Sequence, residues 1–330
     1  MASTELSPGL GPAAAPSAGQ SDAQPGSPPS RAREVAVRSG QALHRLYRAL
    51  RSNPKAATGF ILLTFVCVLA AVPGLIAHDP PRAEIYGRSL GPSASHLFGT
   101  TVYGQDIFSQ FIWGARETLI IAVVSGFLST VLSVIMGVSA AYLGGAWDGG
   151  LNLITDTLLV IPGFPLLLII AAYLPNSGVV VLIAILVITG YSYGARQLRA
   201  QALSLRSRDH LEAARVRGER GSYIIAVEII PTMVPLIVAT FLGTAVFNVL
   251  FAAGLQFIGF GNPASVSWGT MLYWAQNNEA LSIGQYLWAL MPGLGIAILG
   301  ASFALLNYAF DEIGNPALRP VRRHRVKRAR

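Results

Sequence analysis

Residues 209–231 form a charged segment between long uncharged stretches, and their spacing predicts a short helix that must dock on another surface. Asp209 and Glu212 fit a capping box, in which an acidic N-cap and a carboxylate three positions later satisfy free N–H groups. Gly218 predicts the end of the helix, because glycine adopts a left-handed conformation at low cost. The helix within 209–218 has about eight residues and a length of roughly 12 Å, too short for stability in isolation.

The residues that usually perform chemistry are sparse and scattered. Cys67 is the only cysteine, and the five histidines lack ligand spacing, so we predict no metal site. The two lysines, Lys55 and Lys327, do not follow the glycine-rich loop that holds nucleotide phosphates. We therefore predict no catalytic residue and no cofactor in this chain, and any energy from ATP would come from another polypeptide.

The composition is that of a polytopic membrane protein. Hydrophobic residues make up 52% of the chain and charged residues 12%, with a mean hydropathy of +0.51. About 20 apolar residues suffice to cross the hydrocarbon core of a membrane. The uncharged runs, with a turn signal at 174–178, predict an all-α fold with six transmembrane helices. We expect these spans at about 56–77, 118–143, 150–174, 178–198, 229–254 and 285–310.

The basic residues predict how these spans are oriented. Of 24 Lys and Arg residues, seven precede the first span, seven lie between the fourth and fifth, and seven follow the sixth. Only Arg82, Arg88 and Arg116 fall on the other side, so the positive-inside rule predicts cytoplasmic N- and C-termini. The chain then divides into a first span at 55–78, an outer loop at 79–115 and a core of five spans at 116–310. A second outer loop covers 257–284, and the helix at 209–218 is cytoplasmic.

The two ends of the chain have their own compositions. Residues 1–33 are rich in Ala, Gly, Pro and Ser and are expected to be disordered. In 34–54, apolar residues recur at helical spacing beside a stripe of arginines, which predicts an amphipathic interfacial helix, with a solvated linker as the alternative. The net charge of +8 and the basic cytoplasmic tail 311–330 raise the possibility of nucleic-acid binding. Anionic lipid headgroups explain such a tail better, so we predict the lipid bilayer as its partner and no nucleic acid.

The segment 209–231 resembles the cytoplasmic loop of ABC importer permeases, whose pattern is Glu-Ala-Ala, three residues, Gly, and later a hydrophobic pair and Pro. The matching residues, with Arg215 inside the pattern, are Glu212, Ala213, Ala214, Gly218, Ile229, Ile230 and Pro231. The resemblance implies a type I ABC importer transmembrane domain whose short helix docks on a separate ATPase and transmits its closure. It also implies that ATP and Mg are bound by two cytoplasmic ATPase subunits.

Further motifs resemble the second permease subunit of dipeptide, oligopeptide and nickel importers. They include Asn53-Pro54 and His78-Asp79-Pro80 around the first span, a Phe-Gly-Thr segment, and a Trp-Gly segment after the fifth span. The resemblance implies a receptor-side position for Phe98, Gly99, Thr100, Gly104, Asp106, Trp268 and Gly269. Gln105 and Gln110 stand where this family commonly has arginine. The resemblance further implies a multi-pass protein of the bacterial inner membrane, paired with a homologous permease in a heterodimer and served by an extracytoplasmic substrate-binding protein.

Few polar residues within the spans are candidates to line a path. Asp156 is one, since an ionisable group in a span usually faces protein or water, although packing against a neighbouring subunit explains it better than substrate contact. The other candidates are Asn248, Gln256, Tyr191 and Tyr193.

We therefore predict a permease subunit of an ATP-driven importer, with di- or oligopeptides as the expected cargo. A nickel or oligosaccharide importer of the same family is the first alternative. An ion-coupled carrier is the second, although such carriers place ionisable groups near the membrane midplane. A membrane scaffold is the third.

Overall fold

The computed structural model describes residues 53–77, 79–174 and 178–314, all within one unit, Arg48–Arg330. The predicted tail 1–33, nearly all of the predicted interfacial helix and the tail beyond residue 314 lie outside the described residues. Across the described residues the fold is helical, with a single β-bridge and no strand. Five helices are long and apolar enough to cross a membrane, and a bent pair counts as a sixth. The predicted all-α fold with six spans is confirmed.

The first span consists of α2 (Pro54–Ala71) and a short continuation, α3 (Pro73–Ile76). The side chain of Asn53 caps α2 by accepting hydrogen bonds from two N–H groups of the first turn. α2 packs closely on the last helix of the fold, because a Cβ atom at Gly59 would lie only 2.9 Å from Cβ of Leu305. Small residues allow such close approach between helices in a membrane.

The second span, α4 (Ile107–Leu143), begins before residue 118, so the expected outer loop 79–115 is wrong for residues 107–115. Asp106 is the N-cap, and its carboxylate accepts a hydrogen bond from the N–H of Ser109 at 2.8 Å. Two charged residues at 116 and 117 end the uncharged run but not the helix, since charge limits burial in lipid and not helix formation. With 37 residues, α4 is about 55 Å long and extends beyond a hydrocarbon core of roughly 30 Å.

The third span, expected as one helix at 150–174, is a pair bent by 91°, α5 (Gly145–Val160) and α6 (Gly163–Ala172). Pro162 causes the break, because the residue before a proline avoids the helical conformation. Ile161 is accordingly extended, with φ −72° and ψ 129°.

The fourth span, α7 (Val179–Arg206), runs past the expected end at 198 and leads to the short α8 (Asp209–Val216). Next come α9 (Gly221–Tyr223), a π-helical segment η1 (Ile224–Ile229) and α10 (Ile230–Phe257). These last three run on as one helix, which is the fifth span.

The stretch 257–284, expected to be a loop, contains the helix α11 (Trp268–Asn277) and precedes the sixth span, α12 (Tyr286–Gly314). Its polar residues suggested a loop, but Ser267 is an N-cap whose hydroxyl accepts a hydrogen bond from the N–H of Thr270. The Thr270 hydroxyl in turn accepts one from the N–H of Ser267, which completes a capping box.

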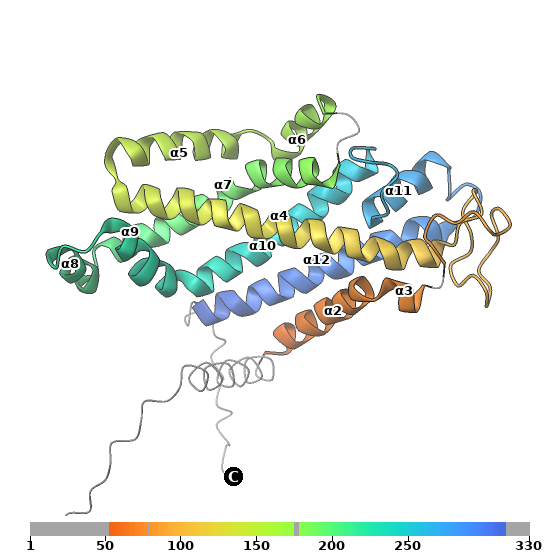
Figure 1. Ribbon diagram of the computed structural model, residues 1–330, viewed down its shortest axis with the longest axis horizontal. Helices are drawn as coiled ribbons and strands as arrows, with labels where there is room; N and C mark the ends of the chain where they lie inside the picture. The colour runs from red at the N-terminus through yellow and green to blue at the C-terminus, as the bar shows by residue number, and fades with distance from the viewer. Residues whose placement is uncertain (1–52, 78, 175–177, 315–330) are drawn as a thin grey trace, which may run out of the picture. The chain divides into compact units, whose positions relative to one another are not determined.

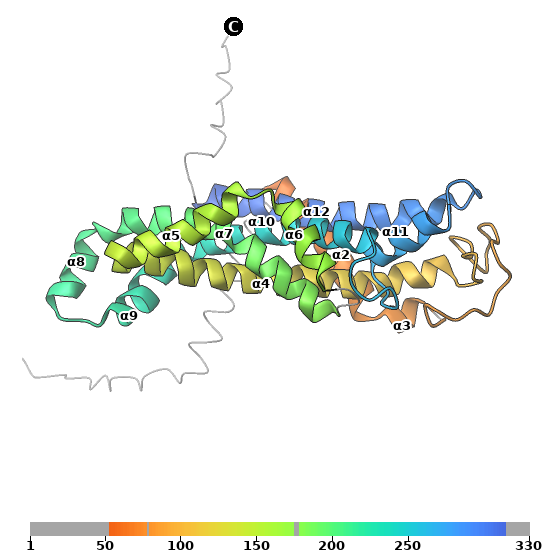
Figure 2. The ribbon, with the colours of Figure 1, turned by 90° about the horizontal axis from the view of Figure 1, so that it is seen from above.

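The long helices lie side by side, with short elements at both of their ends (Figure 1). α4 packs along α7 and α10, while α12 packs against both α10 and α2. α8 and α9 lie at one end of these helices, and α3, α11 and the loop before α4 lie at the other, as Figure 2 also shows. The segments with predicted cytoplasmic and outer positions are therefore at opposite ends of the same helices.

Candidate functional site

α8 is fixed to the bundle by one face and exposed on the other. Leu211 and Ala214 are fully buried in a cluster with residues from α4, α7, η1 and α10. Glu212, Ala213 and Val216 are exposed, Val216 by 84%. The exposed face thus presents a carboxylate and an apolar side chain, while the buried face rests on four helical elements. A displacement imposed on α8 from outside would therefore reach several spans.

The predicted glycine stop of α8 is confirmed. Gly218 has φ +77°, in the left-handed region that favours glycine. Its N–H donates to the carbonyl of Arg215 at 2.9 Å, and the N–H of Glu219 donates to the carbonyl of Ala214 at 3.2 Å. This pair of bonds is a Schellman motif, which satisfies carbonyls at the end of a helix.

The predicted capping box at the start of α8 is wrong. The N-cap is Arg208, whose side chain makes no capping hydrogen bond, and Asp209 is the first helical residue. The carboxylates of Asp209 and Glu212 both lie in the first turn, where negative charge is favoured by the helix dipole. The motif was misassigned by one position, because a carboxylate in the first turn and one at the N-cap give similar sequence signals.

Tyr142, near the end of α4, contacts both α8 and the start of the fifth span. The Arg215 guanidinium lies 5.4 Å from the centre of the Tyr142 ring, within the range of a cation–π contact. A Cβ atom at Gly221 would lie 2.9 Å from the same ring, so the start of α9 also presses against it. Sequence reasoning assigned Tyr142 no such role, because one aromatic residue at a helix end is not a specific signal.

Pro231 is the second residue after the π-helical segment. The N–H of Ile230 donates to the carbonyl of Ile225, a bond one residue longer than in an α-helix. Proline has no N–H to continue the ladder. The hydroxyl of the next residue, Thr232, donates to the carbonyl of Glu228 at 2.8 Å. Single π-helical turns are frequent at functional sites, and this one lies between α8 and the membrane part of α10.

The outer loop is closed by glycines that no other residue could replace without strain. Gly99 and Gly104 have φ values of +81° and +77°. A Cβ atom would lie 2.5 Å from the Leu90 carbonyl oxygen at Gly99, and 2.3 Å from that of Tyr86 at Gly104. The buried Thr100 hydroxyl donates to a backbone carbonyl at 2.7 Å and accepts from the N–H of Leu90 at 2.9 Å. Together these contacts hold the loop in one shape.

Asp106 and Phe98 connect this loop to the start of α4. One oxygen of Asp106 caps α4, and the other lies 3.9 Å from Nδ1 of His96, both residues being buried. The Phe98 ring packs edge-on against Phe108 and Phe111.

Trp268 and Gly269 are buried in the contact between α11 and the long helices. The Trp268 ring stacks on Phe111, and its Nε1 donates to the Phe111 carbonyl at 2.9 Å. A Cβ atom at Gly269 would lie 2.4 Å from Oε1 of Gln256. The predicted receptor-side residues therefore shape this end of the bundle from inside, and exposed neighbours such as Tyr103 form its surface.

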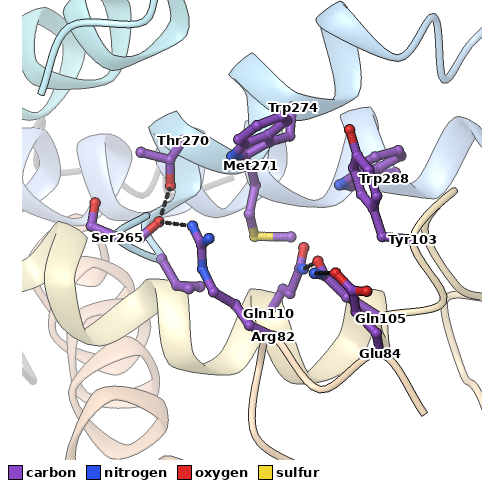
Figure 3. A pocket seen from close by; sticks show the side chains of 11 residues that line it. Arg82, Glu84, Tyr103, Gln105, Gln110, Ser265, Thr270, Met271, Trp274 and Trp288 are labelled. Atoms are coloured by element: carbon purple, nitrogen blue, oxygen red, sulfur yellow. Dashed lines mark hydrogen bonds between the residues drawn. The ribbon is translucent and has the colours of Figure 1, made fainter. Parts of the chain in front are cut away.

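Arg82 joins the two outer segments and was not singled out from the sequence as a site residue. Its guanidinium donates to the backbone carbonyls of Pro263 and Ser265. The bond to Ser265, at 3.0 Å, is drawn in Figure 3. Burial lowers the pKa of Arg82, and the carboxylate of Glu117 opposes that shift. Arginine nonetheless stays charged in proteins, so it holds the segment before α11 against the outer loop.

A pocket of about 200 Å³ lies beside Arg82. Gln110 donates to Gln105 at 2.6 Å, and Gln105 donates to Glu84 at 3.3 Å. This chain of neutral amides occupies the two positions at which the resemblance leads one to expect arginine. Figure 3 shows the amides below Met271, with Trp274 above it and Trp288 and Tyr103 to its right.

The candidates for a path occupy different environments. Asn248 is fully buried and donates to the Ser125 hydroxyl at 2.9 Å, and Gln256 accepts from the Ser267 hydroxyl at 2.8 Å. Both therefore join helices within the bundle. Tyr191 is buried, and Asp156 is exposed on α5. Tyr193, 73% exposed, is the one of these candidates that lines a cavity of about 510 Å³.

This cavity lies between α5, α7, α10 and α12, near the middle of α7 and α10. Its walls combine apolar residues of α5 and α10 with neutral hydrogen-bonding groups. The polar residues besides Tyr193 are Thr189, Ser192, Gln197, Thr240, Thr244 and Asn307.

An ion pair holds α5 as one wall of the cavity. Nε and an Nη of Arg199 on α7 each donate to Asp148 on α5 at 2.7 Å, and Asn152 donates to the same carboxylate at 2.7 Å. Such two-point contacts fix geometry as well as charge. Thr155 is the one buried residue of α5, so this pair is a main constraint on its position.

The long apolar helices, with the short helix α8 at one end, fit one class of membrane protein. Residues 129–318, more than half of the chain, match the family described as binding-protein-dependent transport system inner membrane component. The chain belongs to this family and is a permease subunit of an ABC importer, with the multi-pass helices of an inner-membrane protein.

Curated relatives match most of the chain. The dipeptide transport system permease protein DppC of Bacillus subtilis is 29% identical over 83% of this chain and 85% of its own length. The oligopeptide transport system permease protein OppC of Mycobacterium tuberculosis is 27% identical over 84% and 94%, respectively. The probable D,D-dipeptide transport system permease protein DdpC of Escherichia coli is 29% identical over 82% and 91%.

Proposed function

We propose that this chain forms half of the translocation path of an ATP-driven importer of di- or oligopeptides. The observation that carries the coupling part of the proposal is the two-sided packing of α8. Leu211 and Ala214 anchor it in the bundle, while Glu212, Ala213 and Val216 face outward. The relatives named for dipeptides and oligopeptides support the cargo.

In this account α8 docks on a cytoplasmic ATPase subunit, and ATP with Mg is bound there and not by this chain. Closure of the ATPases pushes α8, and its contacts with Tyr142 and η1 pass the displacement to α4 and α10. ATP binding and cargo release are then linked by one coupling free energy. A homologous second permease completes the path, and both termini are cytoplasmic.

At the opposite end of the helices, an extracytoplasmic binding protein delivers the cargo. The contacts of Arg82, Thr100 and Trp268 give this end a fixed shape. A preformed docking surface lowers the entropic cost of binding the receptor. Tyr103 and its exposed neighbours would make the direct contacts.

The test is peptide uptake by the complete complex, with receptor, second permease and ATPases, in vesicles. We expect ATP- and receptor-dependent uptake, and Glu212→Arg should lower uptake and receptor-stimulated ATPase activity by about tenfold or more, within the usual range of coupling between sites. Glu212→Gln, the matched variant, should lose less. Because Glu212 is exposed, insertion should not change.

Three results would contradict parts of this proposal. Normal uptake by Glu212→Arg would remove the coupling role of α8. ATP-driven uptake of nickel or an oligosaccharide, without peptide uptake, would remove the peptide assignment. Uptake driven by an ion gradient in the chain alone would favour a carrier instead.

A further inference from the structure

The cavity between α5, α7, α10 and α12 has a consistent chemical character. Among the described residues that line it, none carries a charged side chain, and the phenol of Tyr193 is the one ionisable group. Charged residues are close in sequence, since Asp156 and Arg196 lie on α5 and α7, but neither is part of the lining. Arg199 is paired with Asp148 outside the cavity.

The hydroxyl groups of the lining are oriented by their own helices. Thr189 donates to the carbonyl of Ile185 at 2.9 Å, and Thr240 donates to that of Leu236 at 2.9 Å. Each hydroxyl has one proton and two lone pairs, so with the proton used on the helix it offers an acceptor to any guest.

Two side-chain amides complete the lining. Oδ1 of Asn307 is buried and has no hydrogen-bond donor within the described residues. Gln197 is exposed, and its Oε1 lies 3.4 Å from the Thr240 hydroxyl, whose proton is directed to the Leu236 carbonyl at the shorter distance of 2.9 Å. An amide group both donates and accepts, which is also true of each peptide group of a peptide chain.

On the basis of the proposed function, we infer that this cavity binds the peptide groups of the cargo and does not discriminate between cargo side chains of different charge. Charge–charge interactions are strong where the dielectric constant is low, so even one unpaired charge in the lining would favour one class of peptide and hinder the opposite class. A neutral lining with amide and hydroxyl groups passes acidic, neutral and basic peptides alike.

The test uses the complete complex in vesicles and three tripeptides, Ala-Glu-Ala, Ala-Ala-Ala and Ala-Lys-Ala. Each is supplied at a concentration that saturates the receptor, so that the rates report the transport step. For the wild type, we expect the three rates to agree within about threefold, which corresponds to roughly 0.7 kcal/mol. Gln197→Glu and Asn307→Asp each replace a neutral amide with a negatively charged carboxylate of similar size. Both should lower the rate for Ala-Glu-Ala relative to Ala-Lys-Ala by about tenfold, or roughly 1.4 kcal/mol.

The matched control is Gln201→Glu, the same change on the same helix at an exposed residue outside the lining. It should keep the wild-type ratio of rates. A wild-type preference above tenfold for one charge would overturn the inference, as would variants that keep the wild-type ratio, while the peptide importer would stand in both cases. Failure of the wild type to transport any of the three peptides would instead remove the proposed cargo.

Discussion

Substitution of Gly218 tests whether the end of α8 contributes to the proposed coupling. The glycine has φ +77°, and a Cβ atom there would have no neighbour within 4 Å. Alanine at this position therefore meets no clash, and its free-energy cost is only that of the left-handed backbone conformation, about 1–2 kcal/mol. A penalty of that size changes the ratio of native to alternative conformations of this segment by about 5–30-fold. Asparagine tolerates this conformation better than alanine, and a β-branched residue tolerates it worst.

We therefore expect receptor-stimulated ATPase activity and peptide uptake to fall in the order Gly, Asn, Ala, Val at position 218. The assay is the initial rate of uptake by the complete complex, normalised to the amount of inserted subunit. Gly284→Ala is the matched control, because Gly284 has φ +82°, equally open space and a position in the outer segment. It should leave the ratio of ATP hydrolysed to peptide transported unchanged. Equal activity of Gly218→Val and wild type would refute the reasoning.

Two further predictions concern packing and topology. Gly269→Ala should destabilise the subunit by about 1–3 kcal/mol through overpacking and so lower the melting temperature of the complex. Gly293→Ala should not, because a Cβ atom at Gly293 has open space around it. Equal melting temperatures of the two variants would contradict the packing account. In a Cys67→Ala background, a cysteine at Ser95 should react with an impermeant thiol reagent from outside intact cells, and one at Ser222 only after the membrane is opened. Labelling of Ser222 from outside would reverse the predicted orientation.

The membrane spans were predictable from the sequence because lipid excludes charge, but the ends of the helices were not. The uniformly apolar part of α4 starts only after Arg116 and Glu117, whereas the helix itself starts at its N-cap, Asp106. Charge patterning reports the membrane-embedded part, and capping reports the helix, so the two limits differ whenever a helix extends beyond the lipid. The bend at Pro162 was likewise present in the sequence, because proline disturbs the residue before it.

In the candidate site, local features were predictable from the sequence and contacts between distant residues were not. The stop at Gly218 is a local backbone effect and was predicted correctly. The contact of Arg215 with Tyr142, the tie of Arg82 to the segment before α11, and the pair of Asp148 with Arg199 join residues far apart in the chain. No spacing rule reports such contacts, because they depend on how the helices pack.

The most direct test of the central claim is a photo-crosslinking residue at Val216 in the complete, transport-active complex. The side chain of Val216 is 84% exposed on α8, and substitution there should not disturb the buried face. We predict a crosslink to an ATPase subunit whose yield changes when ATP is bound, and no crosslink to it from the same residue placed at Tyr103 at the outer end. An active complex in which Val216 never crosslinks to an ATPase would contradict the claim that α8 couples ATP to transport.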